Sequence, residues 1–157
     1  MALTNSGELY GWGECLYLGR EQLTDLNDKA VIDIVLPIQV MKDIEWISCG
    51  VTHAVAGTKN GRIIAWGDAR GFSNSKGEKH HQLPTDITDL VTKQLGSDPL
   101  QQAACGNKFT ALTTRKGLSL LGQVEEFGAR DFQSPDPVVG LSVSYEPCIA
   151  LLTEKKT

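Results

Sequence analysis

The sequence lacks the segments and motifs that would place the chain in a membrane or in a common enzyme class. None of its apolar runs approaches the ~18–20 residues that a bilayer-spanning helix needs. It has no Gly-x-x-x-x-Gly-Lys-Ser/Thr phosphate loop and no Gly-x-Ser-x-Gly nucleophile motif. Gly11-Trp12-Gly13 is not a dinucleotide fingerprint, because no helix start follows it and the later glycine is missing. We therefore expect no membrane insertion, no catalytic residue and no cofactor.

Positive charge is also in short supply. The chain has 15 Lys and Arg residues against 19 Asp and Glu residues, a formal net charge of -4. Nucleic-acid-binding domains usually carry a basic stripe, because their affinity comes largely from phosphate contacts. The charge balance therefore predicts no binding to DNA.

Cysteines are few, and no two of them have the Cys-x-x-Cys spacing of a zinc site. The adjacent pair His80-His81 lacks converging third and fourth ligands, so we predict no metal site. No Asn-x-Ser/Thr sequon appears and no signal peptide precedes the first predicted strand, so we expect a reducing compartment, the cytoplasm or the nucleus. The four cysteines are Cys15, Cys49, Cys105 and Cys148.

What the sequence does contain is a repeat, clearest over residues 47–67. This stretch holds an apolar run, a Cys-Gly pair, a second apolar run, a turn and a third run ending in Trp-Gly. The turn glycine recurs at Gly7, Gly61 and Gly117, at spacings of 54 and 56 residues. The pair Cys49-Gly50 recurs 56 residues later, and a degraded last copy covers residues 143–153. Such a period is typical of a stacked repeat architecture.

Each copy has the pattern of a β-hairpin. Glycine accepts a positive φ without steric cost, so we predict hairpin turns at Ser6-Gly7, Asn60-Gly61 and Lys116-Gly117. The tryptophan that closes each strand is bulky enough to fill a wedge between packed sheets. We therefore expect four repeat side chains to be buried between neighbouring sheets: Cys49, His53, Trp66 and Cys105.

The pattern Ser-Cys-Gly-x-x-His, apolar run, Thr-x-x-Gly, apolar run, Trp-Gly resembles the regulator-of-chromosome-condensation repeat. The third copy departs from it, since Leu121-Gly122-Gln123 stands where Trp66-Gly67 would. The resemblance implies a β-propeller whose blades are four-stranded antiparallel sheets. It also implies twelve structural repeat positions: Gly7, Trp12, Gly13, Cys49, Gly50, His53, Gly61, Trp66, Gly67, Cys105, Gly106 and Gly117.

The predicted fold is all-β, a partial propeller with about three of the usual seven blades. We expect one repeat domain over residues 1–157, with modules at approximately 1–57, 58–113 and 114–157. Because ~4–8 blades are needed to close a ring, we expect a fragment of a larger propeller. Apolar residues at helical spacing over 87–95, after Thr85 as N-cap, predict a short helical insertion. That helix is either a packing insert or a partner-facing insertion.

The chemically tempting residues have structural explanations. His53 occupies a repeat position that holds Phe109 in the next copy, so a catalytic base is disfavoured. Cys49 shares its position with Cys105, which favours a scaffold role over a nucleophile. The acidic tip at Glu125, Glu126 and Asp131 is typical of a solvated loop.

The resemblance implies a binding platform, so we predict a non-catalytic module for protein–protein interaction. The alternative, of another class, is a guanine-nucleotide exchange factor for a Ran-like small GTPase, which would need a complete ring and a projecting wedge. A third interpretation is a degenerate fragment with no independent function. Unpaired blade edges invite pairing with other chains, so we also expect self-association.

Overall fold

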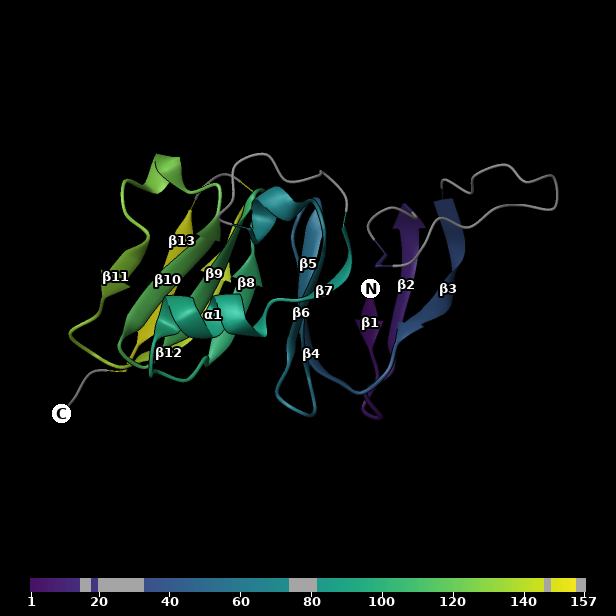
Figure 1. The fold of residues 1–157 in the computed structure, drawn as a ribbon, viewed down its shortest axis with the longest axis horizontal. Helices are drawn as coiled ribbons and strands as arrows, with labels where there is room; N and C mark the ends of the chain where they lie inside the picture. Colours follow the sequence, from purple (N-terminus) through teal and green to yellow (C-terminus); the bar gives the residue numbers. More distant parts are fainter. Residues whose placement is uncertain (15–17, 20–32, 74–81, 146–147, 155–157) are drawn as a thin grey trace.

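The computed structural model describes residues 1–14, 18–19, 33–73, 82–145 and 148–154. The strands form four antiparallel sheets (Figure 1). The first three follow one another along the long axis of the molecule, and the fourth lies against a face of the third. The prediction of an all-β partial propeller with consecutive antiparallel sheets is thereby confirmed.

We number the sheets in chain order. The first contains β1 (Ala2–Leu3), β2 (Leu9–Glu14) and β3 (Asp33–Met41). The second contains β4 (Ile44–Cys49), β5 (His53–Thr58), β6 (Ile63–Gly67) and β7 (Gln82–Asp86). The third contains β8 (Gln102–Cys105), β9 (Phe109–Thr114), β10 (Gly117–Gly122) and β11 (Asp131–Gln133). The fourth contains β12 (Val138–Val143) and β13 (Ile149–Thr153). The helical elements are η2 (Ala69–Gly71), α1 (Thr88–Leu95) and η3 (Glu125–Phe127).

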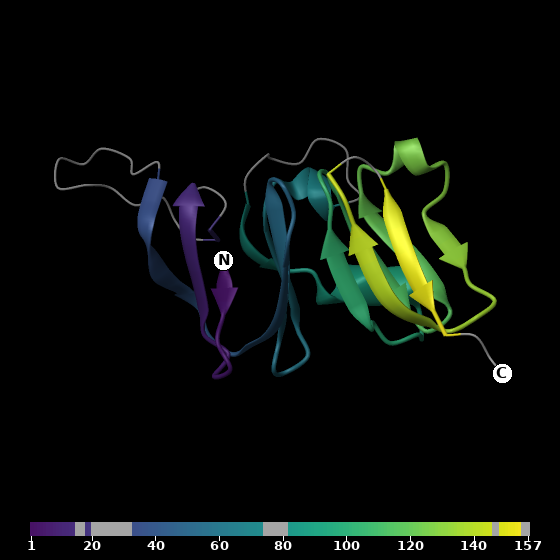
Figure 2. The same cartoon turned by 180° about the vertical axis from the view of Figure 1, so that it is seen from behind.

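The core consists of three apolar clusters, one for each pair of consecutive sheets. Figure 2 shows these sheets from behind. Successive side chains of a strand point to opposite faces. Along β5, Ala54 and Ala56 accordingly join the cluster shared with the first sheet, whereas Val55 joins the cluster shared with the third. Each internal sheet is therefore apolar on both faces, as stacked repeats require.

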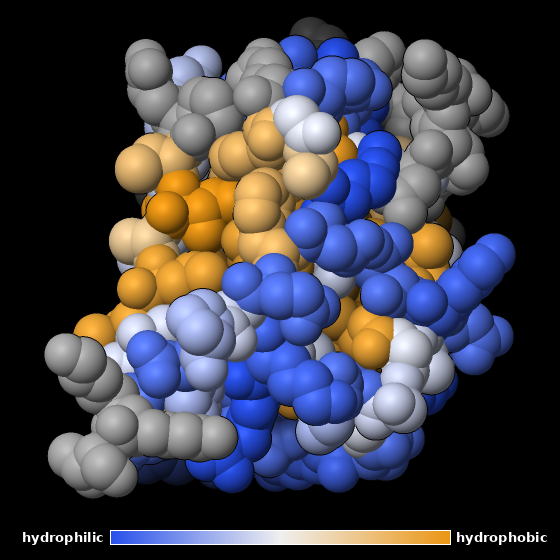
Figure 3. Space-filling model, turned by 90° about the vertical axis from the view of Figure 1, so that its left-hand side faces the viewer, coloured by the Kyte–Doolittle hydropathy of each residue, from blue (hydrophilic) through white to orange (hydrophobic). Residues whose placement is uncertain are grey.

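The fourth sheet has one apolar face that no described residue covers. Leu141, Val143 and Ile149 pack against the core of the third sheet. On the outer side, Val139 is 44% exposed and Leu152 is 65% exposed. Figure 3 shows the apolar area over this end of the molecule. We call this surface the outer face of the fourth sheet. It is made of Val139, Ala150 and Leu152, with Ser142 and Gly140 paired opposite Ala150 and Leu152.

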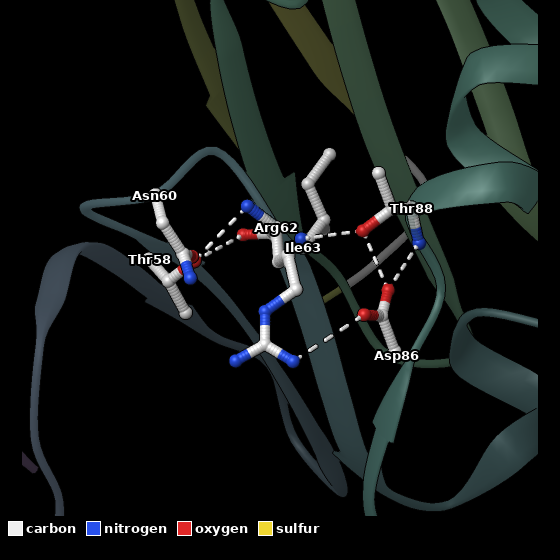
Figure 4. Close-up of polar contacts among 6 residues, drawn as sticks. All are labelled: Thr58, Asn60, Arg62, Ile63, Asp86 and Thr88. Carbon is white, nitrogen blue, oxygen red and sulfur yellow. Dashed lines mark hydrogen bonds and ion pairs between the residues drawn. The ribbon is translucent and has the colours of Figure 1, made fainter.

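The hairpin turn at Asn60-Gly61 forms as predicted. The Thr58 amide donates to the Arg62 carbonyl at 2.9 Å, the Gly61 amide donates to the Thr58 carbonyl at 2.9 Å, and Gly61 has φ +81. Beside this hairpin, the Ile63 amide donates to the Thr88 hydroxyl oxygen at 2.9 Å (Figure 4). The start of α1 is thus tied to the strand that follows the turn.

The short helix is confirmed, but its start is not the predicted one. α1 begins at Thr88, whose amide donates to an Asp86 carboxylate oxygen at 2.9 Å, so Thr85 is not the N-cap. The hydrogen bonds from Thr88 hold the pKa of Asp86 below its ordinary value. Val91 is buried, and Leu90 and Leu95 pack against the cluster between the second and third sheets. These contacts make α1 a packing insert.

The third predicted turn is displaced by one residue. Arg115 and Lys116 form the turn, and Gly117 is already in β10, paired with Thr114. A Cβ at Gly117 would lie 2.0 Å from the Phe132 carbonyl oxygen on β11. Glycine is needed here because β11 approaches closely, not because of a positive φ.

The two tryptophans of the repeat differ in burial, which corrects the expectation that each fills a wedge between sheets. Trp66 is fully buried and packs with Leu9 and Ile44 between the first and second sheets. Trp12 occupies the same position in β2 but is 44% exposed. By strand alternation, Trp12 points away from the second sheet, and no described sheet lies on that side.

The expected module borders fall inside sheets. The border at 57/58 lies at the end of β5, within the second sheet, and the border at 113/114 lies within β9 of the third. A sequence module and a sheet are therefore offset from each other. No helix in the described part of the chain is long and apolar enough to cross a membrane.

Candidate functional site

The repeat residues meet where the second sheet packs against the third, at a place we call the His53 joint. The His53 side chain is 3% exposed, and its Nε2 lies 2.9 Å from the Thr110 Oγ1 of β9. Thr110 Oγ1 in turn donates to the Gly71 carbonyl at 2.8 Å. Because the hydroxyl proton is used for that bond, Thr110 accepts from Nε2, which fixes the proton of the neutral ring on Nε2. The ring therefore links β5, β9 and η2.

His53 is poorly suited to acid–base catalysis. Burial lowers its pKa from 6.5 to about 4, partly opposed by the nearby Asp68 carboxylate. Its Nδ1 has no hydrogen-bond partner among the described residues, and the Phe72 ring lies tilted 6.2 Å away. A neutral imidazole without access to solvent cannot exchange protons with a substrate. These observations agree with a structural role.

Cys105 lies at the same joint and is also unreactive. It is 6% exposed. Its amide donates to Ser48 Oγ of β4 at 3.0 Å, and its thiol donates to the Ser48 carbonyl at 3.4 Å. Burial raises the pKa of the thiol to about 12. A thiolate is the nucleophilic form of cysteine, so Cys105 is scaffold.

Cys49 departs from the prediction that all the repeat cysteines are buried. Its side chain is exposed, although surrounding protein atoms still raise its pKa. Ser48 points to the third sheet through its bonds to Cys105, so strand alternation turns Cys49 to the opposite face. There the described part of the first sheet does not cover it. Cys15 and the His80-His81 pair lie outside the described residues.

Glycines allow the backbones to approach at this joint. A Cβ at Gly50 would lie 2.3 Å from the Gly106 carbonyl oxygen, and one at Gly106 would lie 2.2 Å from the Phe109 ring. Gly67 has φ +90, and a Cβ there would lie 2.4 Å from the Thr52 carbonyl oxygen. Any larger residue would push the second and third sheets apart or distort the turn before β5.

Three residues of the joint were not predicted from the sequence: Thr110, Gly71 and Gly122. Gly122 pairs with Phe109 as Gly67 pairs with His53, and both glycines have φ +90. The third copy therefore keeps the second glycine, with Leu121 in place of tryptophan. Counting from the Cys-Gly pairs would have found it, because Gly122 follows Gly106 by 16 residues and Gly67 follows Gly50 by 17.

No catalytic or metal-binding arrangement is found in the described parts of the chain. They contain no group of three or more His, Cys, Asp or Glu side chains that could hold a metal ion. The Asp131 carboxylate of the acidic tip accepts from Ser119 and from Gln94. A hollow of about 200 Å³ lies beside η3, lined by Lys108, Glu125 and Tyr145 among others. No nucleophile is paired with a base in that hollow.

Comparisons with known proteins identify the repeat. No family model matches the chain. It is 29% identical over 150 residues to the probable E3 ubiquitin-protein ligase HERC4 of Mus musculus, a match that covers 91% of this chain and 14% of that protein. It is 26% identical over 130 residues to the RCC1 domain-containing protein RUG3, mitochondrial, of Arabidopsis thaliana, covering 81% of this chain and 27% of RUG3.

A solved structure supports the architecture. The crystal structure of human WBSCR16 superposes with a TM-score of 0.73 at 18% sequence identity, covering 98% of this chain and 42% of that chain. At that identity the likeness shows the fold alone. The chain thus spans well under half the length of each of these proteins, and the ligase activity in the name of HERC4 is that protein's.

Proposed function

Because the chain is a partial propeller built from regulator-of-chromosome-condensation repeats, we propose that it is a non-catalytic module for protein–protein interaction. We propose further that residues 1–157 act as one repeat domain. The observation that carries the proposal is the outer face of the fourth sheet, an exposed, largely apolar surface on a fold whose facing sheet surfaces pack against one another.

Strand alternation shows what kind of surface this is. Ala150 and Leu152 of β13 lie two residues apart on one side of the strand, whereas Ile149 packs inward. In the second sheet, Val55 lies on the corresponding side of β5 and is fully buried by the third sheet. The outer face therefore has the composition of a surface that elsewhere in this chain is covered by protein.

Covering the outer face would be favourable. Fully burying a leucine or valine side chain contributes about 1.5–3 kcal/mol, and Leu152 is 65% exposed. A partner that buries Val139 and Leu152 would gain on the order of 1–2 kcal/mol from each. Exposed apolar patches on otherwise polar surfaces commonly mark interaction sites.

The test is site-specific photo-crosslinking in cells that express the full chain. A photoreactive residue replaces Leu152, and a control chain carries it in place of Lys93, an exposed residue on α1. We expect discrete protein adducts from position 152 only, and their loss when Val139→Glu is added. Equal adducts from both positions, or none from position 152, would contradict the proposal.

Self-association is a second part of the proposal. The edge strand β11 is exposed along its whole length, and edge strands with free backbone groups pair readily with other chains. We expect light scattering from the purified chain to give a mass that rises with concentration. A constant monomeric mass over a wide concentration range would contradict self-association. It would not contradict the proposed interaction with other proteins.

The exchange-factor alternative has a separate test. A fluorescent-nucleotide release assay on Ran should show no acceleration by the purified chain. Acceleration by a monodisperse monomer would favour the alternative over the interaction module. The acidic charge balance supports the further proposal that the chain does not bind DNA at physiological salt.

We also propose a cytoplasmic or nuclear location. The described cysteines Cys49, Cys105 and Cys148 are all free thiols, which is usual in reducing compartments. Imaging of the tagged full chain would test this, and secretion would contradict it.

A further inference from the structure

The His53 joint can hold the imidazole ring only in its neutral form. Thr110 Oγ1 gives its proton to the Gly71 carbonyl and accepts from Nε2. The second ring nitrogen, Nδ1, is buried without a partner among the described residues. It lies against Gly71, where a Cβ would be only 2.3 Å from it. A proton added at Nδ1 would therefore create a buried cation, whose cost the Asn107 backbone offsets only in part.

The charged and titratable groups around the ring do not offset that cation. From the segment before η2, the Asp68 carboxylate is the nearest anion, but it already accepts from the Arg70 guanidinium, with Nε 3.0 Å and 2.9 Å from its two oxygens. From β8, Cys105 faces the joint as a neutral thiol, since burial raises its pKa. From β5 and β9, the neighbours are Thr110 and apolar side chains. Asp68 and the Asn107 backbone both favour protonation and raise the pKa of His53, but burial has the larger effect and lowers it.

We propose that His53 is an acid-sensitive latch between the second and third sheets: protonation of its ring opens this end of the joint. The open form exposes the β4–β5 turn, η2 and the segment before β9. The opening is local, because the rest of the joint is held by Val55, Leu112 and Leu121, whose apolar contacts do not depend on pH.

Few other polar bonds cross the joint at this end. The Val51 amide donates to the Gly106 carbonyl at 3.2 Å, and the Gln123 amide donates to the Arg70 carbonyl at 3.0 Å. The Cys105 amide donates to Ser48 Oγ at 3.0 Å. When the joint opens, the Val51 and Cys105 amides lose their acceptors and report on the latch, whereas the Gln123 amide also donates to the Lys108 carbonyl at 2.9 Å and keeps that bond.

The size of the effect follows from linkage. In the open form the ring is in water, with a pKa near the ordinary 6.5, and in the closed form its pKa is about 4. The open form therefore binds more protons between these two values, and its population rises as the pH falls through 6.5 and levels off below 4. Between pH 7.5 and pH 5 the ratio of open to closed form should rise about 30-fold.

The experiment is amide hydrogen exchange by NMR on the full chain at these two pH values, corrected for intrinsic exchange rates. We expect the protection factors of Val51 and Cys105 to fall about 30-fold in acid and to stay below those of Ala56 and Ile64, which lie within the second sheet and are released only by global unfolding. His53→Gln is the matched variant, since its side-chain amide can donate to Thr110 and does not titrate. In His53→Gln these two amides should show no such loss.

A second variant guards against misfolding of the first. His53→Phe places at the joint the residue that the chain itself has at the equivalent position, Phe109, and it too should abolish the pH dependence. The proposal is overturned if wild type and variants lose protection equally in acid. It is also overturned if the joint amides and Ala56 and Ile64 have equal protection factors at both pH values, because all of them would then exchange through global unfolding.

Discussion

Replacing Trp66 by alanine tests the stacking of the first two sheets most severely. The Trp66 side chain is fully buried and lies in one apolar cluster with Leu9, Ile44, Ala54 and Ala56. A Cβ at Gly19 would lie 3.0 Å from its indole ring, so the backbone also approaches the ring closely. Truncation would leave a cavity that neither sheet can fill without moving.

The expected cost is large for a domain of this size. Removing a buried tryptophan side chain typically lowers the free energy of unfolding by about 3–5 kcal/mol, through lost burial and the remaining cavity. Whole domains are stable by only about 5–15 kcal/mol. We expect Trp66→Ala to lose a substantial part of the total free energy of unfolding. The stability of Trp66→Phe should lie between those of Trp66→Ala and the wild type.

Urea unfolding followed by far-UV circular dichroism measures this cost, and the chain supplies its own control. Trp12 holds the same repeat position but is 44% exposed, so Trp12→Ala should cost roughly 1 kcal/mol or less. The reasoning is refuted if the two substitutions cost the same, or if Trp66→Ala costs less than about 1 kcal/mol.

Three further predictions follow from the same contacts. Gly67→Ala should destabilise the fold more than Gly61→Ala. Both glycines have a positive φ, but only at Gly67 would an added Cβ clash. The urea midpoints of the two variants measure the difference. A thiol reagent applied to the native chain and mapped by mass spectrometry should label Cys49 and spare Cys105; labelling at equal rates would contradict the described burial. For His53, whose pKa is lowered to about 4, the unfolded state binds the extra proton as the pH falls below 6.5. The free energy of unfolding should therefore decline by up to about 3 kcal/mol as the pH falls from 6.5 to about 4, and then level off. His53→Phe should lack this contribution to the decline.

Features set by a few neighbouring residues could be predicted from the sequence. The turn at Asn60-Gly61 needs only a glycine that accepts φ +81, and the helix over Thr88–Leu95 follows from the spacing of its apolar residues. The burial of Trp66 followed from the repeat pattern, which implies a neighbouring sheet on each side.

Features that depend on distant neighbours could not be predicted. Trp12 and Cys49 are exposed although their repeat partners are buried, because burial depends on which sheet lies alongside. The bond between His53 and Thr110 joins residues 57 positions apart, and the sequence gives no sign of that pairing. Gly122 was not recognised for a simpler reason. The third hairpin turn is one residue shorter, so aligning the copies on their turn glycines displaced Gly122 by one position.

The central claim is that each inner sheet face is buried by the neighbouring sheet, whereas the outer face of the fourth sheet is exposed. Solvent paramagnetic relaxation of leucine methyl groups tests it directly, at a concentration where light scattering gives a monomer. Leu152, 65% exposed, should be strongly relaxed by a soluble paramagnetic agent, whereas Leu121, fully buried between the second and third sheets, should be protected. Equal protection of Leu152 and Leu121 in the monomer would contradict the account.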